Sequence, residues 1–203
     1  MENKKRLVGI VVLTIIVALI TAGCGSAPSA GGGGGEAAAS GPAVFDNLEI
    51  SALQARNAEC GKDGDVYFFS GAKTSLESGT YEILLARSRA VSARGYQYLE
   101  FEIKADNMDL LEDIDGFFPR IRTGETYTQF NGSRALKGAI AEASGAENWI
   151  QVSVPIGADN THELGDNLRT VLPRIDSLLF RFICMDMEPV SGKIYLRNFR
   201  FNN

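Results

Sequence analysis

Beyond a glycine-rich stretch near its start, the chain alternates apolar and polar residues over short segments separated by turn-forming residues. The clearest case is residues 98–104 (YLEFEIK), where Leu99, Phe101 and Ile103 point one way and the intervening residues point the other way. Residues 149–156 (WIQVSVPI) repeat the pattern. A period of two is typical of a strand with one buried face.

Further segments of similar length and composition predict a fold made mainly of strands. The expected strands cover residues 44–50, 66–69, 81–89, 98–104, 118–123, 127–131, 149–156, 177–185 and 193–202. Two segments, 108–114 and 163–172, are expected to be short helices. Many short strands joined by turns predict an all-β domain, an antiparallel β-sandwich with one or two short helices.

The start of the chain follows a different pattern. Residues 1–6 carry three cations, residues 7–20 are almost entirely apolar, and small residues then lead to Cys24. This order predicts a secretory signal peptide over residues 1–23. The sequence T-A-G-C resembles the lipobox of bacterial lipoproteins, although Thr21 stands where that family prefers Leu. The resemblance implies that the Cys24 thiol receives a diacylglycerol and that the preceding segment is removed.

An uncleaved transmembrane anchor is the alternative for the apolar segment. A span needs about 20 apolar residues, and residues 7–23 supply 17 positions only if Gly23 and two threonines are counted. Either interpretation predicts an extracytoplasmic chain, held on a bacterial membrane or cell surface. Residues 24–42 are expected to be the lipidated cysteine and a disordered Gly/Ala/Ser-rich linker, and residues 43–203 the folded domain.

Composition narrows the expected partners. The chain has 20 basic and 25 acidic residues, and loss of three basic and one acidic residue with the leader leaves 17 and 24, a net charge of −7. Nucleic acid is bound through clustered Lys and Arg, so we expect no nucleic-acid partner. His162 is the single histidine, and no zinc site or cofactor is expected. A disulfide between Cys60 and Cys184 stays open, while the apolar strand around Cys184 favours its burial.

Several segments resemble the galactose-binding-like β-jelly-roll of bacterial carbohydrate-binding modules. They are VFDNLE at 44–49, YLEFEIKADN at 98–107, NWIQVSVPI at 148–156, IDSLLFRF at 175–182 and SGKIYLRNFRF at 191–201. The last segment is similar to the closing strand of that family. The resemblance implies a jelly-roll sandwich with a carbohydrate ligand.

The resemblance also raises two structural questions. These modules often hold a structural calcium ion with a carboxylate of the closing strand, and Arg197 stands at that position. A guanidinium offers calcium no oxygen ligand, so we expect no metal. Arg197 either replaces the ion by pairing with Asp46 or Glu49, or faces water. Because the tryptophan of the family is usually packed into the fold, Trp149 is expected in the core.

The candidate ligand-binding residues are polar side chains on the outer phase of the predicted strands. They are Arg120, Arg122, Tyr127, Gln129, Gln151 and Arg181. If these strands are neighbours, one sheet exposes the set together with Glu102. Planar donors and acceptors beside an aromatic ring are the chemistry that sugar recognition uses. The alternative is a solvated sheet face with cross-strand Arg–Glu pairs.

Catalysis has one candidate pair of residues. Glu100 and Glu102 share a strand face about 7 Å apart, and glycosidases use two carboxylates. Alternate residues of any strand reach this spacing, so we expect no enzyme. The expected function is a membrane-anchored lipoprotein with a non-catalytic glycan-binding sandwich. A structural or assembly lipoprotein that binds another envelope protein is the alternative, and a small glycoside hydrolase is a third.

Overall fold

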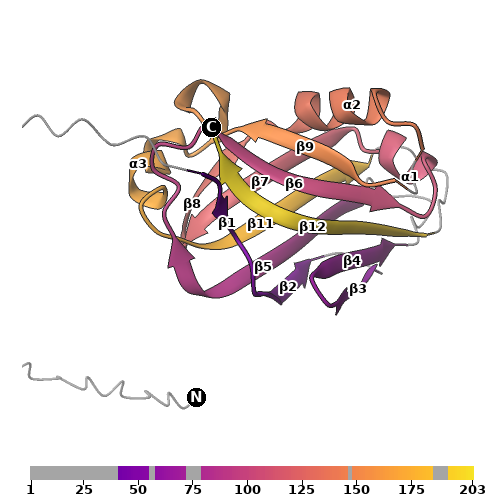
Figure 1. Ribbon diagram of the computed structural model, residues 1–203, viewed down its shortest axis with the longest axis horizontal. Coiled ribbons are helices and arrows are strands. Elements are labelled where there is room, and N and C mark those ends of the chain that lie inside the picture. The colour runs from indigo at the N-terminus through magenta and orange to yellow at the C-terminus, as the bar shows by residue number, and fades with distance from the viewer. Residues whose placement is uncertain (1–40, 55–57, 72–78, 146–147, 185–191) are drawn as a thin grey trace, which may run out of the picture. The chain divides into compact units, whose positions relative to one another are not determined.

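The computed structural model describes residues 41–54, 58–71, 79–145, 148–184 and 192–203. Two antiparallel sheets pack face to face in this part of the chain, which confirms the predicted sandwich (Figure 1). The predicted signal peptide, Cys24 and the linker as far as residue 40 lie outside the described residues.

The first sheet is named the β12 sheet after its central strand. Its strand order is β3–β4–β12–β6–β9, and β1 also pairs with β12. The strands are β1 (Ala43–Val44), β3 (Ala58–Asp63), β4 (Val66–Gly71), β6 (Tyr98–Ala105), β9 (Ile150–Pro155) and β12 (Lys193–Asn202). Strand β3 was not predicted from the sequence.

The second sheet is named the β11 sheet, and its strand order is β10–β8–β7–β11–β5–β2. The strands are β2 (Leu48–Gln54), β5 (Gly79–Val91), β7 (Gly116–Thr123), β8 (Thr126–Phe130), β10 (Thr161–Glu163) and β11 (Ile175–Cys184). The strands predicted at 118–123 and 127–131 pair with each other as β7 and β8, while the short edge strand β10 was not predicted.

In the described residues, three helices and two 3₁₀ turns accompany the sheets. Helices α1 (Asp109–Glu112) and α3 (Leu168–Val171) fall within the two predicted segments, and 3₁₀ turns cover Ala158–Asn160 and Gly165–Asn167. Helix α2 (Ser133–Ala141) was not predicted, and it packs beside β9 through Leu136 and Ile140. No helix in the described residues is long and apolar enough to cross a membrane.

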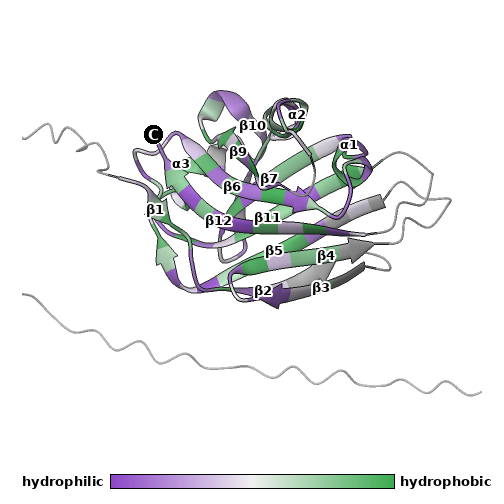
Figure 2. Cartoon of the chain, turned by 45° about the vertical axis from the view of Figure 1, so that its right-hand side comes forward, coloured by the Kyte–Doolittle hydropathy of each residue, from purple (hydrophilic) through white to green (hydrophobic). Residues whose placement is uncertain are grey.

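Interlocking phenylalanine rings fill the space between the sheets. The Phe101 ring of β6 lies 5.5 Å from Phe117 of β7 and 5.1 Å from Phe180 of β11, centroid to centroid. The Phe199 ring of β12 lies 5.3 Å from that of Phe180. Hydrophobic and hydrophilic residues alternate along the strands that carry these rings (Figure 2). Each strand therefore gives one face to the core and the other to solvent.

The two cysteines of the folded domain are not joined to each other by a disulfide. Cys184 is buried at the end of β11, as expected, and Cys60 on β3 is half-buried. The alternative of a disulfide between them is not realised in this structure.

One side of the sandwich is closed by hydrogen bonds from one sheet to the other. The buried Tyr67 hydroxyl of β4 and the Lys62 ammonium of β3 both donate to the carbonyl oxygen of Leu48 in β2, each at 2.7 Å. Burial raises the pKa of the Tyr67 hydroxyl, which therefore stays protonated and donates. The carbonyl of Leu48 thus receives two donors in place of water.

A β-bulge in β12 decides what this strand presents to solvent. Arg197 lies opposite Glu102 and Arg200 lies opposite Glu100, so one extra residue stands between the two pairs. Asn198 absorbs it in a left-handed conformation with φ +55°, which Asn tolerates better than most residues. The bulge brings two arginines three residues apart to the same outer face.

The phenylalanine layer predicts a large effect of truncation. We expect Phe180→Ala to lower the free energy of unfolding by about 3–5 kcal/mol, because it removes a fully buried ring and leaves a cavity. Urea denaturation of the purified protein measures this. Val44→Ala is the control, since Val44 is 55% exposed and its truncation should change stability by less than about 0.5 kcal/mol. Similar losses for the two variants would contradict the proposed role of the layer.

Candidate functional site

Five of the six predicted ligand-binding residues lie in the β11 sheet. Arg120 pairs with Gln129 across β7 and β8, and Arg122 pairs with Tyr127 in the same two strands. Arg181 of β11 lies opposite Phe118 of β7. We call this outer surface the arginine face; its members are Arg120, Arg122, Tyr127, Gln129 and Arg181.

Arg120 is fixed by three groups around its guanidinium. Its Nε donates a 2.5 Å hydrogen bond to Gln129 Oε1, and its guanidinium carbon lies 4.7 Å from the centre of the Tyr127 ring. Nη2 lies 4.0 Å from a carboxylate oxygen of Glu163 in β10. A stacked and hydrogen-bonded guanidinium presents its remaining N–H groups in a fixed direction, as recognition of an oxygen-rich ligand requires.

Arg122 and Arg181 are held less completely. Arg181 Nε lies 3.4 Å from Glu82 Oε1, and Arg122 Nη2 lies 4.0 Å from Glu125 Oε2. The Nε atoms of both arginines are buried, and neither has a hydrogen-bond partner of good geometry in the described part of the chain. Arg181 and Glu82 form a cross-strand Arg–Glu pair of the kind that the alternative interpretation, a solvated sheet face, expects.

The sixth predicted residue, Gln151, does not join this face, and neither does Glu102. Gln151 lies on β9 and pairs with Glu102 of β6, so both belong to the β12 sheet. The condition that all these strands are neighbours in one sheet is therefore not met. Alternation gives the phase of a side chain but not the sheet to which its strand belongs.

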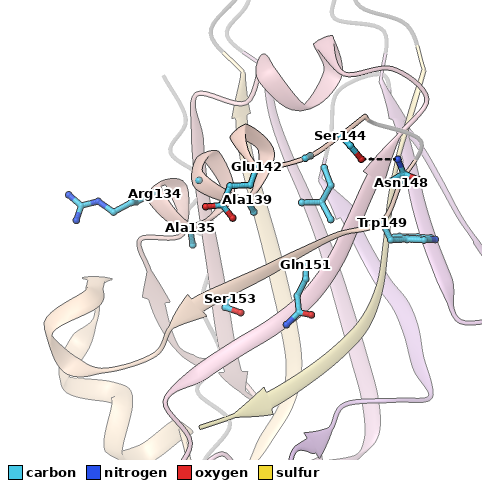
Figure 3. Close-up of a pocket in the computed structure, with 12 residues that line it drawn as sticks. Arg134, Ala135, Ala139, Glu142, Ser144, Asn148, Trp149, Gln151 and Ser153 are labelled. Carbon is cyan, nitrogen blue, oxygen red and sulfur yellow. Dashed lines mark hydrogen bonds between the residues drawn. The ribbon is translucent and has the colours of Figure 1, made fainter.

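Gln151 instead lines a groove between β9 and α2. The groove has a volume of about 570 Å³, and Figure 3 shows polar side chains along it and the Trp149 ring pointing away from α2. Its polar lining consists of Arg134, Glu142, Ser144, Asn148, Gln151 and Ser153. The volume suits a small ligand, and Trp149 is also among the residues that line the groove.

Trp149 lies on the outer face of the β12 sheet, which corrects the expectation of core packing. The side chain is half-buried, and the Arg197 guanidinium carbon lies 3.9 Å from the ring centre. The Lys104 ammonium lies 5.0 Å from the Trp149 ring and 5.1 Å from the Tyr195 ring. Cations of the protein itself therefore occupy positions over these rings.

Arg197 corrects a second expectation. It neither pairs with the opening strands nor faces water freely, because its Nε donates a 2.6 Å hydrogen bond to Glu102. Asp46 pairs with Arg87 at 2.6 Å and Glu49 pairs with Lys62 at 3.4 Å. In the described ranges, no group of three or more His, Cys, Asp or Glu residues is placed to hold a metal ion.

The candidate catalytic carboxylates are both occupied by arginines. Glu102 accepts the hydrogen bond from Arg197, and Glu100 accepts hydrogen bonds from Arg200 Nε at 2.7 Å and Ser153 Oγ at 3.2 Å. Burial raises the pKa of the Glu100 carboxyl, but hydrogen bonds from Arg200, Asn202 and Ser153 and the Arg200 charge outweigh burial and hold the pKa below its ordinary value. A carboxyl with a lowered pKa is a poor general acid.

His162 and Phe118 also lie at the arginine face, and neither was among the six predicted ligand-binding residues. His162 Nδ1 lies 3.0 Å from Gln129 Nε2, and its ring centre lies 4.7 Å from that of Phe118. His162 is 33 residues from Gln129, and only the pairing of β10 with β8 brings them together. No local sequence pattern carries that information.

The chain matches no protein-family model and no curated protein. Similar solved structures include a low-affinity xylan-binding module of family 86 from Roseburia intestinalis, with 11% identity over 80% of this chain and 96% of that chain and a TM-score of 0.45. A mutant of a family 29 carbohydrate-binding module has 11% identity over 76% of this chain and 79% of its own, with a TM-score of 0.37.

Part of a larger enzyme is also similar to this chain. A β-1,2-glucanase from Parabacteroides distasonis has 14% identity over 75% of this chain and 22% of its own length, with a TM-score of 0.44. The two sheets described above are the basis for assigning a sandwich. The binding and cleavage activities named here belong to the similar proteins and are not assigned to this chain by the similarity.

The hydrogen bonds that Glu100 accepts from Arg200 and Ser153 predict that the stability of the protein depends on pH. Because the folded pKa is lowered, the stabilisation is present above the unfolded value near 4.5 and is lost as pH falls through the folded pKa. We expect Glu100→Gln to lower the free energy of unfolding by roughly 1.5–3 kcal/mol at neutral pH, and the difference from the unsubstituted protein to shrink below about pH 4.5.

Denaturant titrations at several pH values measure this difference. Glu125→Gln is the control, because the Glu125 side chain is fully exposed and its substitution should have little effect at any pH. A stability loss in Glu100→Gln that stays constant from neutral to acidic pH would rule out the carboxylate as its source.

Proposed function

We propose that this protein is a bacterial lipoprotein, anchored outside the cytoplasm through Cys24, whose sandwich binds a glycan on the arginine face without cleaving it. The observation that carries the proposal is the assembly on one face of oriented guanidinium donors beside a half-buried aromatic ring, with Arg120 fixed between Gln129 and Tyr127. Sugar recognition uses planar polar groups for hydroxyls and an aromatic surface for the apolar side of the ring.

The opposite face of the sandwich bears on the non-catalytic part of this proposal. On the β12 sheet, Arg197 lies over the Trp149 ring and Lys193 lies 4.4 Å from the centre of the Phe68 ring. Tyr127 on the arginine face carries the Arg120 guanidinium in the same way, so the choice of the arginine face rests on its hydrogen-bonded guanidinium and not on its ring. Glu100 and Glu102 on that face are engaged by arginines, which supports binding without hydrolysis.

The alternative, an assembly lipoprotein that binds another envelope protein, would be favoured by a large apolar surface patch. Among the described residues, the exposed large hydrophobic side chains are Val44 and Leu164. These two single residues provide no observation that favours the alternative.

Glycan binding predicts a loss of affinity when Arg120 is removed. We expect the purified protein to bind at least one glycan on an array, and Arg120→Ala to weaken that binding by about 10- to 100-fold, because hydrogen bonds from a charged donor contribute about 1.5–3 kcal/mol. Calorimetric titration with the selected glycan measures the change.

Arg94→Ala is the matched control, since Arg94 is exposed in the turn between β5 and β6. It should bind as the unsubstituted protein does. Absence of binding to every glycan on the array would contradict the proposed function, and an equal loss in both variants would exclude the arginine face as its location.

The lipid anchor predicts a second result. In bacterial cells supplied with a palmitate analogue that carries an alkyne, we expect the protein to be labelled and to sediment with membranes. Cys24→Ser should lose the label, because the thiol is the acceptor that the lipobox resemblance implies. Cys60→Ser is the control and should keep it. Labelling that persists in Cys24→Ser would contradict lipidation at this residue.

A further inference from the structure

His162 reaches the arginine face through an irregularity in the edge strand β10. Thr161 lies opposite Phe130 and Glu163 lies opposite Gln129, so His162 is the extra residue of a β-bulge. Bulges redirect side chains and are frequent beside functional sites. The ring packs against Phe118, and the side chain remains 43% exposed.

A chain of two hydrogen bonds determines which ring nitrogen of His162 carries the proton. Arg120 has donors only, so the Gln129 atom that faces its Nε must be the acceptor Oε1. The other end of the same amide, Nε2, is a donor and lies 3.0 Å from His162 Nδ1. Nδ1 must therefore accept, and the ring proton is on Nε2.

The surroundings keep this arrangement in place. Gln129 is only 1% exposed, and turning its amide over would set two donors against each other at Arg120. Glu163 Oε1 lies 3.9 Å from Nδ1, too far for a hydrogen bond that would favour a proton there. The Nε2–H group is thus the hydrogen-bond donor that the ring retains for a ligand.

Backbone strain directly after β10 provides an independent observation at the same place. Leu164 has φ +54°, a left-handed conformation that is rare for a bulky residue and costs of order 1–3 kcal/mol. Its carbonyl oxygen accepts hydrogen bonds from Thr128 Oγ1 at 3.2 Å and from the Asn167 backbone at 3.0 Å. Strain that neighbouring contacts maintain in this way is concentrated at binding and catalytic sites.

We propose that His162 is a ligand-binding residue of the arginine face, which presents Nε2–H to an acceptor oxygen of the glycan in an orientation set by Arg120 and Gln129. The identity of the ligand rests on the proposed function, whereas the position of the proton does not. Glu82 and Gln129 Oε1 are already engaged by arginines. Glu163 and Glu125 also lie at this face, each 4.0 Å from an arginine, so the face offers both donors and acceptors. The Nε2–H group of His162 adds a donor that an acceptor oxygen of the ligand would receive.

The position of the proton is tested without any ligand. Because His162 is the only histidine of the chain, long-range ¹H–¹⁵N spectra of the full-length protein in detergent micelles contain a single histidine ring. At about pH 8, where an ordinary imidazole is neutral, we expect the proton on Nε2. Gln129→Glu offers acceptor oxygens to both neighbours and should move a proton to Nδ1. A proton on Nδ1 of the unsubstituted protein would overturn the proposed order of hydrogen bonds from Arg120 through Gln129 to His162. An unchanged position of the ring proton in Gln129→Glu would overturn it as well.

Ligand contact is tested with the glycan that the array identifies. His162→Phe keeps a ring against Phe118 but removes both nitrogens, and we expect binding to weaken about 5- to 10-fold, as the loss of one neutral hydrogen bond implies. Tyr195→Phe is the matched control on the β12 sheet, where the hydroxyl donates to Asp106, and it should bind normally. Equal binding by His162→Phe and the unsubstituted protein would overturn the role of His162 while the proposed function stands. Failure of the unsubstituted protein to bind any glycan would overturn both the proposed function and the ligand-binding role of His162. The ring spectrum would still determine which nitrogen of His162 carries the proton.

Discussion

The layer of phenylalanine rings between the sheets is the constraint on which the rest of the structure depends. Because side chains alternate along a strand, burying Phe117 and Ile121 of β7 directs Arg120 and Arg122 to the solvent side. The same rule on β11 places Arg181 outside, between the buried Phe180 and Phe182. The composition of each outer face thus follows from which residues the core requires.

The two outer faces use similar residues in different ways. On the β12 sheet, arginines and carboxylates neutralise each other directly across the strands, as Arg197 and Glu102 do at 2.6 Å. On the arginine face, Arg120 donates to the amide oxygen of Gln129, and the amide nitrogen of the same side chain donates to His162. A direct ion pair satisfies both partners. The chain of hydrogen bonds from Arg120 through Gln129 to His162 instead leaves the Nε2–H donor of His162 unpaired in an orientation that the chain determines. The number of charges on a face is therefore a weaker guide to binding than the partners that those charges already have.

The sequence predicted the strands well, because the core needs a long and regular pattern of large apolar residues. It predicted the phase of Arg120 and Arg122 for the same reason. Trp149 was predicted wrongly because the family resemblance, which favours the core, was followed in place of the alternation. The alternation that buries Ile150 places Trp149 outside. Helix α2 was missed because only Leu136 and Ile140 mark its buried side.

The sheet to which a strand belongs and the partner of a side chain depend on pairing between strands that are far apart in the sequence, which no local pattern indicates. The sheet to which Gln151 belongs is decided by the pairing of β9 with β6, 53 residues apart at Ser153 and Glu100. The partner of Arg197 depends on the register of β12 against β6, including its bulge. These are properties of the assembled sheets, where each pairing is stabilised by contacts from other strands.

The bulge at Asn198 keeps the two faces of β12 in phase although the strand contains one extra residue. Regular alternation through Asn198 would turn Phe199 and Phe201 to solvent and Arg200 to the core. Because the left-handed residue takes up one position, Arg197 and Arg200 both stay outside and the two phenylalanines stay buried. A residue inserted into a strand can therefore leave both faces unchanged where a bulge absorbs it, and would exchange a charged surface for an apolar one where no bulge forms.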